Sequence, residues 1–123
     1  MNKINWEHLE NENQLLHVLE KSSEKTQLIF KYSSTCSLSN MIFNRFENDW
    51  ESNAMKNINP VFLDILSYRG VSNKIESTLK IRHESPQVLV IENGKCIYDC
   101  SHMSINFNEI KLKFGDKQLF KST

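Results

Sequence analysis

Residues 27–39 decide the fold, and they read Gln27-Leu28-Ile29-Phe30-Lys31-Tyr32-Ser33-Ser34-Thr35-Cys36-Ser37-Leu38-Ser39. The first half is a compact apolar run of strand length, which is typical of a buried strand. The second half is small and polar, and a long helical pattern begins within it. Ile42, Phe46 and Trp50 recur there at i, i+4 and i+8. The stretch therefore predicts a strand that leads directly into a helix, with Cys36 at the junction.

The same patterns can be followed in both directions from this unit. On the N-terminal side they predict a short edge strand over residues 4–9 and a helix from 11 or 12 to 22. The strand over 27–32 and the long helix follow. On the C-terminal side they predict a strand over 61–66 opened by Pro60, a helix over 72–80 after a boundary at Gly70, and strands over 87–91 and 95–100. Asn93-Gly94 is a strong hairpin signal between the last two strands. Ser104 or Asn106 is expected to cap a final helix, which Gly115 closes.

This order, β-α-β-α-β-α-β-β-α, predicts parallel pairing through right-handed crossovers and then an antiparallel hairpin. The fold class is therefore α/β and thioredoxin-like, a mixed sheet of four to five strands with helices on both faces. We expect one domain over residues 1–123, with 115–123 as a flexible tail.

The composition narrows the function classes. The 123 residues carry 15 basic and 15 acidic side chains, so the net charge is zero and nucleic acid is not an expected partner. The first residues are polar, unlike a signal peptide, and no stretch approaches the roughly 18 apolar residues of a membrane helix. We therefore expect a cytoplasmic, monomeric protein without membrane contact. Its three cysteines are expected to be free thiols, because that compartment is reducing.

Cys36 is the expected nucleophile. The first N–H groups of a helix lack internal partners and the helix dipole is positive there, and both effects favour the thiolate. Thr35, Leu38 and Ser39 are the expected thiolate-supporting residues, through the amides of Leu38 and Ser39 and the Ser39 hydroxyl, although Ser39 could equally serve as a helix-start cap. Cys36-Ser37-Leu38-Ser39 is a Cys-x-x-Ser, which has a hydroxyl where a dithiol enzyme has its second thiol. Such a site can exchange a small thiol but is poorly suited to reducing a disulfide within a protein.

The second candidate element is Ser85-Pro86, which opens a strand. In this fold Pro86 is expected to pack against Cys36, and an X–Pro bond at this place can be cis. The backbone of Ser85 is then free to pair with an extended substrate segment. Ser85 and Pro86 are therefore the predicted substrate-binding residues.

Residues 30–39, together with Ser85-Pro86-Gln87 and Asn93-Gly94-Lys95, resemble the YtxJ family of monothiol bacilliredoxins over nearly the whole chain. The resemblance implies a thioredoxin fold and a role in the bacillithiol system. It implies that Cys36 attacks S-bacillithiolated proteins, accepts bacillithiol as a mixed disulfide and passes it to a second bacillithiol. Bacillithiol is then a co-substrate, and no tightly bound cofactor is expected. Many relatives have proline after the nucleophile, where this chain has Ser37.

The remaining polar groups leave alternatives open. With Asn93-Gly94 as the turn, Ile91 is expected to pair with Cys96 and Gln87 with Cys100. We expect Cys96 to pack in the core. Cys100 is expected to be either structural or a secondary thiol two strands from Cys36. Lys31 is interpreted as attracting the carboxylates of a thiol cofactor or as solvating a strand end. His83 is interpreted as tuning the thiolate or as an ordinary surface histidine. Cysteine and histidine lack zinc spacing, so no metal site is expected.

Two other functions fit the same fold. Some monothiol glutaredoxins hold an iron–sulfur cluster between two subunits, with one cysteine from each. A thioredoxin-like fold can also serve as a non-catalytic interaction module.

Overall fold

The computed structural model describes residues 4–116. Its elements are β1 (Glu7–His8), α1 (Glu12–Lys21), β2 (Thr26–Tyr32), α2 (Ser37–Asp49), β3 (Ile58–Asp64), α3 (Arg69–Leu79), β4 (Gln87–Glu92), β5 (Lys95–Ser101), the 3₁₀ turn η1 (His102–Ser104) and α4 (Phe107–Phe114). The predicted order of strands and helices is confirmed, with η1 added before the last helix.

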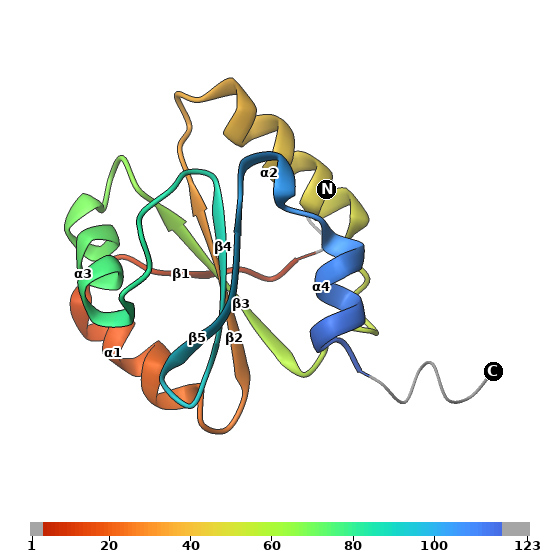
Figure 1. The fold of residues 1–123 in the computed structure, drawn as a ribbon, viewed down its shortest axis with the longest axis horizontal. Coiled ribbons are helices and arrows are strands. Elements are labelled where there is room, and N and C mark those ends of the chain that lie inside the picture. Colours follow the sequence, from red (N-terminus) through yellow and green to blue (C-terminus); the bar gives the residue numbers. More distant parts are fainter. Residues whose placement is uncertain (1–3, 117–123) are drawn as a thin grey trace.

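The five strands form one mixed sheet in the order β1-β3-β2-β4-β5. β3 is parallel to β1 and β2, whereas β4 is antiparallel to β2 and β5. Helices α1 and α3 cover one face of the sheet, and α2 and α4 cover the other (Figure 1). The predicted mixed sheet of four to five strands with helices on both faces is confirmed, and it has five strands.

Each face of the sheet has its own core, here called the α2/α4 core and the α1/α3 core after the helices that cover it. Alternate residues of the central strand, β2, point to opposite faces of the sheet. Phe30 is buried in the α2/α4 core and Ile29 in the α1/α3 core. The ring of Phe30 lies 5.2 Å from that of Phe43 and 5.3 Å from that of Phe46, centroid to centroid. These contacts fix α2, and with it the helix start that carries Cys36, against the centre of the sheet.

Several boundaries differ from the predictions. β1 has two residues, not six, because only Glu7 and His8 pair with β3. β3 begins at Ile58 instead of after Pro60, because its register with β2 starts at the pair Thr26–Ile58. Gly70 lies inside the first turn of α3 and does not form a boundary before it. A Cβ atom added at Gly70 would meet no atom of the described residues within 4 Å, so none of them forces a break there.

The hairpin between β4 and β5 explains where two of the cysteines lie. Asn93 and Gly94 both have positive φ, 53° and 74°, as a two-residue turn of the favoured twist requires. Ile91 pairs with Cys96 as predicted, but Val90 pairs with Tyr98, so Ile97 is an extra residue that forms a β-bulge.

The bulge shifts the rest of the register by one residue. Cys100 therefore pairs with Val88, and Gln87 pairs with Ser101, so the predicted Gln87–Cys100 pairing is wrong. The shift also exchanges the faces of the sheet: Cys96 packs against the α1/α3 core and Cys100 is buried in the α2/α4 core.

The C-terminal helix is capped as predicted. The Asn106 side chain accepts from the Glu109 N–H at 3.1 Å. At Gly115 a Cβ atom would come within 2.6 Å of the Lys111 carbonyl oxygen, so this close approach requires glycine. The Asp116 N–H donates to the Ala54 carbonyl at 2.7 Å. The rest of the expected tail, residues 117–123, lies outside the described part of the chain.

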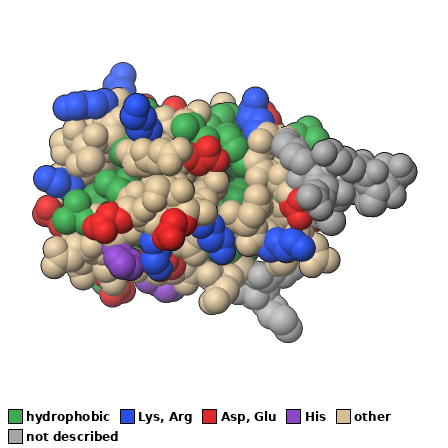
Figure 2. Space-filling view, turned by 90° about the horizontal axis from the view of Figure 1, so that it is seen from below, with side chains coloured by type: hydrophobic (Ala, Val, Ile, Leu, Met, Phe, Trp, Pro, Cys, Tyr) green, Lys and Arg blue, Asp and Glu red, His purple; other side chains and the backbone are tan. Residues whose placement is uncertain are grey.

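Acidic and basic side chains are interspersed on the face shown in Figure 2. Among residues 4–116 no helix is long and apolar enough to cross a membrane.

Candidate active site

Cys36 lies four residues beyond β2 and is the N-cap residue of α2. Its N–H donates to the Ser33 carbonyl at 3.2 Å, which closes a tight turn between strand and helix. Its own carbonyl accepts the first helical bond, from the Asn40 N–H at 3.1 Å. The side chain is half-buried and free of disulfide bonding. The sulfur therefore stands on the residue that joins the central strand to α2.

The N-cap of α2 differs from those of α1 and α4. Asn11 and Asn106 each accept a hydrogen bond from an N–H in the first turn of their helix, at 2.8 and 3.1 Å. Cys36 makes no side-chain capping bond. The N–H groups of Ser37, Leu38 and Ser39 precede the first helical bond, so the positive end of α2 is left without an asparagine or aspartate cap. The N-cap residue of α2 is therefore a cysteine whose side chain makes no capping bond to the first turn of its helix.

Ser39 is fully buried, and its hydroxyl accepts from the Ser33 N–H at 3.0 Å. This bond ties the first turn of α2 back to the start of the loop that holds Cys36. The Thr35 hydroxyl lies 3.4 Å from that of Ser33, and Leu38 packs against the α2/α4 core. These three residues therefore shape the turn around Cys36; their support of a thiolate stays a prediction.

Two residues that the sequence analysis missed fix the same turn from outside. The Tyr32 hydroxyl donates to Oδ1 of Asn40, and Nδ2 of Asn40 donates to the Ser34 carbonyl at 3.2 Å. The end of β2, the loop and the first turn of α2 are thereby joined. The sequence could not predict this contact, because Tyr32 at a strand end and Asn40 eight residues later do not form a recognisable motif.

Ser85 and Pro86 lie at the same end of the sheet. The last pair of the β2–β4 ladder is Lys31–Gln87, so Pro86 follows directly beyond it. The Ser85–Pro86 bond is cis, and the Pro86 carbonyl accepts from the His102 N–H at 3.0 Å. Among residues 4–116, neither backbone group of Ser85 has a hydrogen-bond partner, and its buried hydroxyl has none either. The backbone of Ser85 is thus available for pairing; its pairing with substrate and the packing of Pro86 on Cys36 stay predictions.

The other two cysteines are held as thiols. Burial raises the pKa of Cys100 to about 11, and burial also raises the pKa of Cys96, whose Sγ lies 3.3 Å from the Tyr98 carbonyl. Cys100 borders an open groove of about 820 Å³ that runs from Glu84 to Glu109. At neutral pH neither thiol is ionised to a useful extent, so neither is an expected nucleophile.

The structure contradicts both interpretations of Lys31 and places His83 beside it. Tuning of the thiolate by His83 stays a prediction. Lys31 is only 1 % exposed, so neither a solvated strand end nor a surface cation for a thiol cofactor describes it. Its Nζ lies 2.6 Å from Nδ1 of His83, which is itself partly buried. Hydropathy could not show this, because a lysine next to an apolar run is more often exposed.

Among residues 4–116 no three histidine, cysteine, aspartate or glutamate side chains come together in a way that could hold a metal ion.

A sheet of this topology, with one cysteine at the start of the helix that follows the central strand, defines the class of thioredoxin-fold thiol–disulfide oxidoreductases. Solved structures share the fold. A protein described as an oxidoreductase with a thioredoxin fold superposes with a TM-score of 0.71 at 23% identity, over 85% of this chain and 89% of its own. The thioredoxin of Malassezia sympodialis superposes with a TM-score of 0.70 at 15% identity, over 92% of this chain and 90% of its own. The thioredoxin of Fasciola hepatica superposes with a TM-score of 0.67 at 12% identity, over 86% of this chain and 93% of its own.

The sequence comparison is more specific. The family described as monothiol bacilliredoxin BrxC matches residues 7–110. The chain belongs to the monothiol bacilliredoxin family, and the resemblance drawn from the sequence is confirmed.

Proposed function

We propose that this protein removes bacillithiol from mixed disulfides on cytosolic proteins, with Cys36 as the nucleophile. The observation that carries the proposal is the helix start described above: a single cysteine occupies the N-cap of α2, and a serine stands three residues on, where a dithiol enzyme has its second thiol. Membership of the monothiol bacilliredoxin family supports bacillithiol as the thiol that is exchanged.

The reaction takes two exchange steps. The Cys36 thiolate attacks the bacillithiol sulfur of a protein–bacillithiol disulfide; the new S–S bond joins Cys36 to bacillithiol, and the substrate cysteine leaves as a thiolate that takes a proton from solvent. The thiolate of a second bacillithiol then attacks the bacillithiol sulfur of this intermediate. Cys36 leaves as a thiolate, and bacillithiol disulfide is released. The mixed disulfide on the protein is thereby reduced to a free thiol, one free bacillithiol is consumed, and the two bacillithiol groups leave together as one disulfide.

The surrounding residues have distinct parts in this scheme. The first-turn amides of Leu38 and Ser39 stabilise negative charge on the sulfur, both when it attacks and when it leaves. Ser39 also holds the turn through its bond from the Ser33 N–H, and Thr35 borders it. The free backbone groups of Ser85, beside Pro86, pair with the segment that flanks the modified cysteine of the substrate. Because Ser39 has no sulfur, it cannot displace the bacillithiol bound to Cys36.

The test is a turnover assay with a model protein that carries one bacillithiol on one cysteine, in the presence of free bacillithiol. The wild-type protein and the Cys96→Ser variant should restore the free thiol of the model protein, and Cys36→Ser should not. The Cys100→Ser variant shows whether the second thiol takes part; we expect full activity, because that thiol is protonated. Equal activity of Cys36→Ser and wild type would refute the proposal.

A further inference from the structure

Lys31 is an unusual residue in the middle of this fold. It is the only buried charged side chain among residues 4–116, and it lies at the last residue pair between β2 and β4. Buried lysines are rare because the ammonium loses its hydration. Here burial lowers the pKa of Lys31 to about 8, although Glu76 and Glu84 act in the opposite direction. The position disfavours the charge that it holds at neutral pH, so core stability does not explain a lysine there.

Within the described residues 4–116, the ammonium of Lys31 has one hydrogen-bond partner. Nζ lies 2.6 Å from Nδ1 of His83, and because an ammonium only donates, Nδ1 is the acceptor and the ring proton resides on Nε2. The Ser72 hydroxyl lies 3.2 Å from the same nitrogen. Burial lowers the pKa of His83, and the cation of Lys31 lowers it further, with Arg69 in the same direction and Glu76 and Glu84 opposed. A neutral histidine that accepts from a lysine cation is the state that these groups favour.

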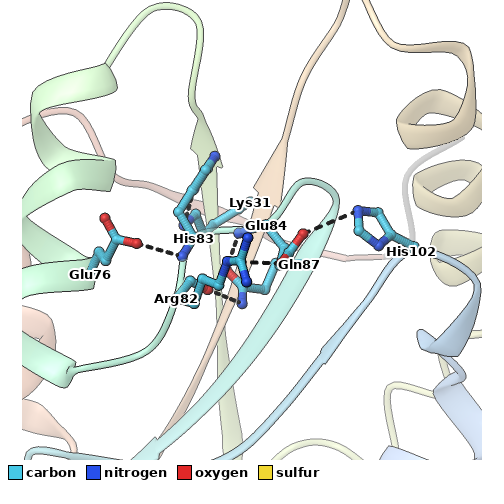
Figure 3. Close-up of polar contacts among 7 residues, drawn as sticks. All are labelled: Lys31, Glu76, Arg82, His83, Glu84, Gln87 and His102. Atoms are coloured by element: carbon cyan, nitrogen blue, oxygen red, sulfur yellow. Dashed lines mark hydrogen bonds and ion pairs between the residues drawn. The ribbon is translucent and has the colours of Figure 1, made fainter.

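His83 belongs to the segment that leads into Ser85 and Pro86. Its own N–H donates to Oε2 of Glu76 at 2.8 Å, so the residue is fixed to α3 as well as to Lys31. Figure 3 shows His83 between Glu76 on one side and Lys31 on the other. The segment is thus held to both α3 and the central strand, two residues before Ser85.

Gln87 closes the same segment from its far end. Its side chain accepts from the Glu84 N–H at 3.2 Å and donates to the Arg82 carbonyl at 3.1 Å. Gln87 is also the residue that pairs with Lys31 in the ladder. Residues 82–87 therefore form a closed turn with two attachments to the end of β2, one through the backbone of Gln87 and one through His83.

We propose that Lys31 is a positioning residue for substrate binding: through His83 it holds the turn of residues 82–87 so that the unpaired backbone of Ser85 is presented to the substrate at the end of the sheet. The inference rests on the proposed function and deepens it. It names the device that sets affinity for the protein substrate, separately from the chemistry of Cys36. Lys31 itself touches neither the substrate nor the reacting sulfur.

The test separates binding from chemistry. Lys31→Met removes the cation at similar volume, and His83→Leu removes the acceptor, whereas His83→Asn keeps an oxygen near the place of Nδ1. We expect Lys31→Met and His83→Leu to raise KM for the bacillithiolated model protein about tenfold, since a hydrogen bond to a charged group is lost, with kcat within about twofold of wild type. His83→Asn should restore a KM near that of wild type.

A second readout excludes general damage to the site. Alkylation of Cys36 by iodoacetamide does not need the Ser85 backbone, so its rate should be unchanged in all three variants. Amide hydrogen exchange within residues 82–85 should be faster in Lys31→Met and His83→Leu than in wild type.

Each other result has a defined meaning. An active wild-type protein with unchanged KM in both Lys31→Met and His83→Leu would overturn this inference and leave the proposed function standing. A raised KM together with an equally lowered kcat and rate of Cys36 alkylation, or failure of both variants to fold, would assign Lys31 and His83 a general structural role. Either result would also overturn this inference. A wild-type protein without any activity would refute the proposed function, and this inference with it.

Discussion

Replacing Lys31 with methionine tests the electrostatics of the buried lysine directly. In the unfolded chain its pKa is that of an ordinary lysine, 10.5, and burial lowers it to about 8 in the folded protein. Each pKa unit corresponds to about 1.4 kcal/mol, so the folded protein disfavours the charged form by roughly 3 to 4 kcal/mol relative to the unfolded chain. The penalty is fully present below pH 8.

The direction in which the stability of the wild type changes with pH follows from proton binding. Between pH 8 and 10.5 the unfolded chain holds the Lys31 proton and the folded protein does not, so raising the pH stabilises the wild-type fold. The methionine variant lacks this term. We expect it to be at least as stable as wild type at pH 7, because its apolar side chain carries no desolvation penalty and the Ser72 hydroxyl still reaches His83. From pH 7 to pH 10 the wild type should gain about 2 to 3 kcal/mol relative to the variant.

Urea unfolding followed by the fluorescence of Trp6 and Trp50, at both pH values and under reducing conditions, measures this difference. Other lysines, tyrosines and thiols also titrate in the range, but they are shared by the two proteins and cancel in the comparison. A difference between wild type and variant that does not change with pH, or that changes in the opposite direction, would refute the account of Lys31.

Three further predictions concern single contacts. Burial, and then Lys31, lower the pKa of His83 from 6.5, so the unfolded chain takes up this proton more readily than the folded protein. The free energy of unfolding in urea should therefore fall as the pH drops below 6.5, and this fall should be smaller in His83→Asn. Ser39→Ala leaves the Ser33 N–H without its acceptor and should cost about 1–3 kcal/mol in urea unfolding, with slower alkylation of Cys36; unchanged values would argue against its role in the turn. Gly94→Ala forces a side chain to φ 74° and should lower the unfolding free energy by about 1 kcal/mol, a loss that a Gly70→Ala control should not show.

The sequence was most informative where local pattern and tertiary burial agree. β2 and β4 are buried on both faces and appear as continuous apolar runs, and the Asn93-Gly94 turn and the Asn106 cap have strong local preferences. Cys36 could be placed at the start of α2 because the apolar run ends and the helical periodicity begins within a few residues.

Tertiary contacts decided what the sequence could not show. The bulge at Ile97 contains no glycine to announce it, so the register of Cys100 was wrong by one residue. The burial of Lys31 depends on His83, which is 52 residues away, and on α3, so no window around the lysine contains the reason for it. The Tyr32–Asn40 contact is likewise produced by the turn between β2 and α2 and by no spacing of residue types.

The most direct measurement is peptide mapping by mass spectrometry after the reduced protein has been incubated with bacillithiol disulfide. We expect one bacillithiol per chain, attached to Cys36, with Cys96 and Cys100 unmodified because burial keeps them as thiols. Attachment to Cys96 or Cys100 with Cys36 left free, or no attachment at all, would contradict it.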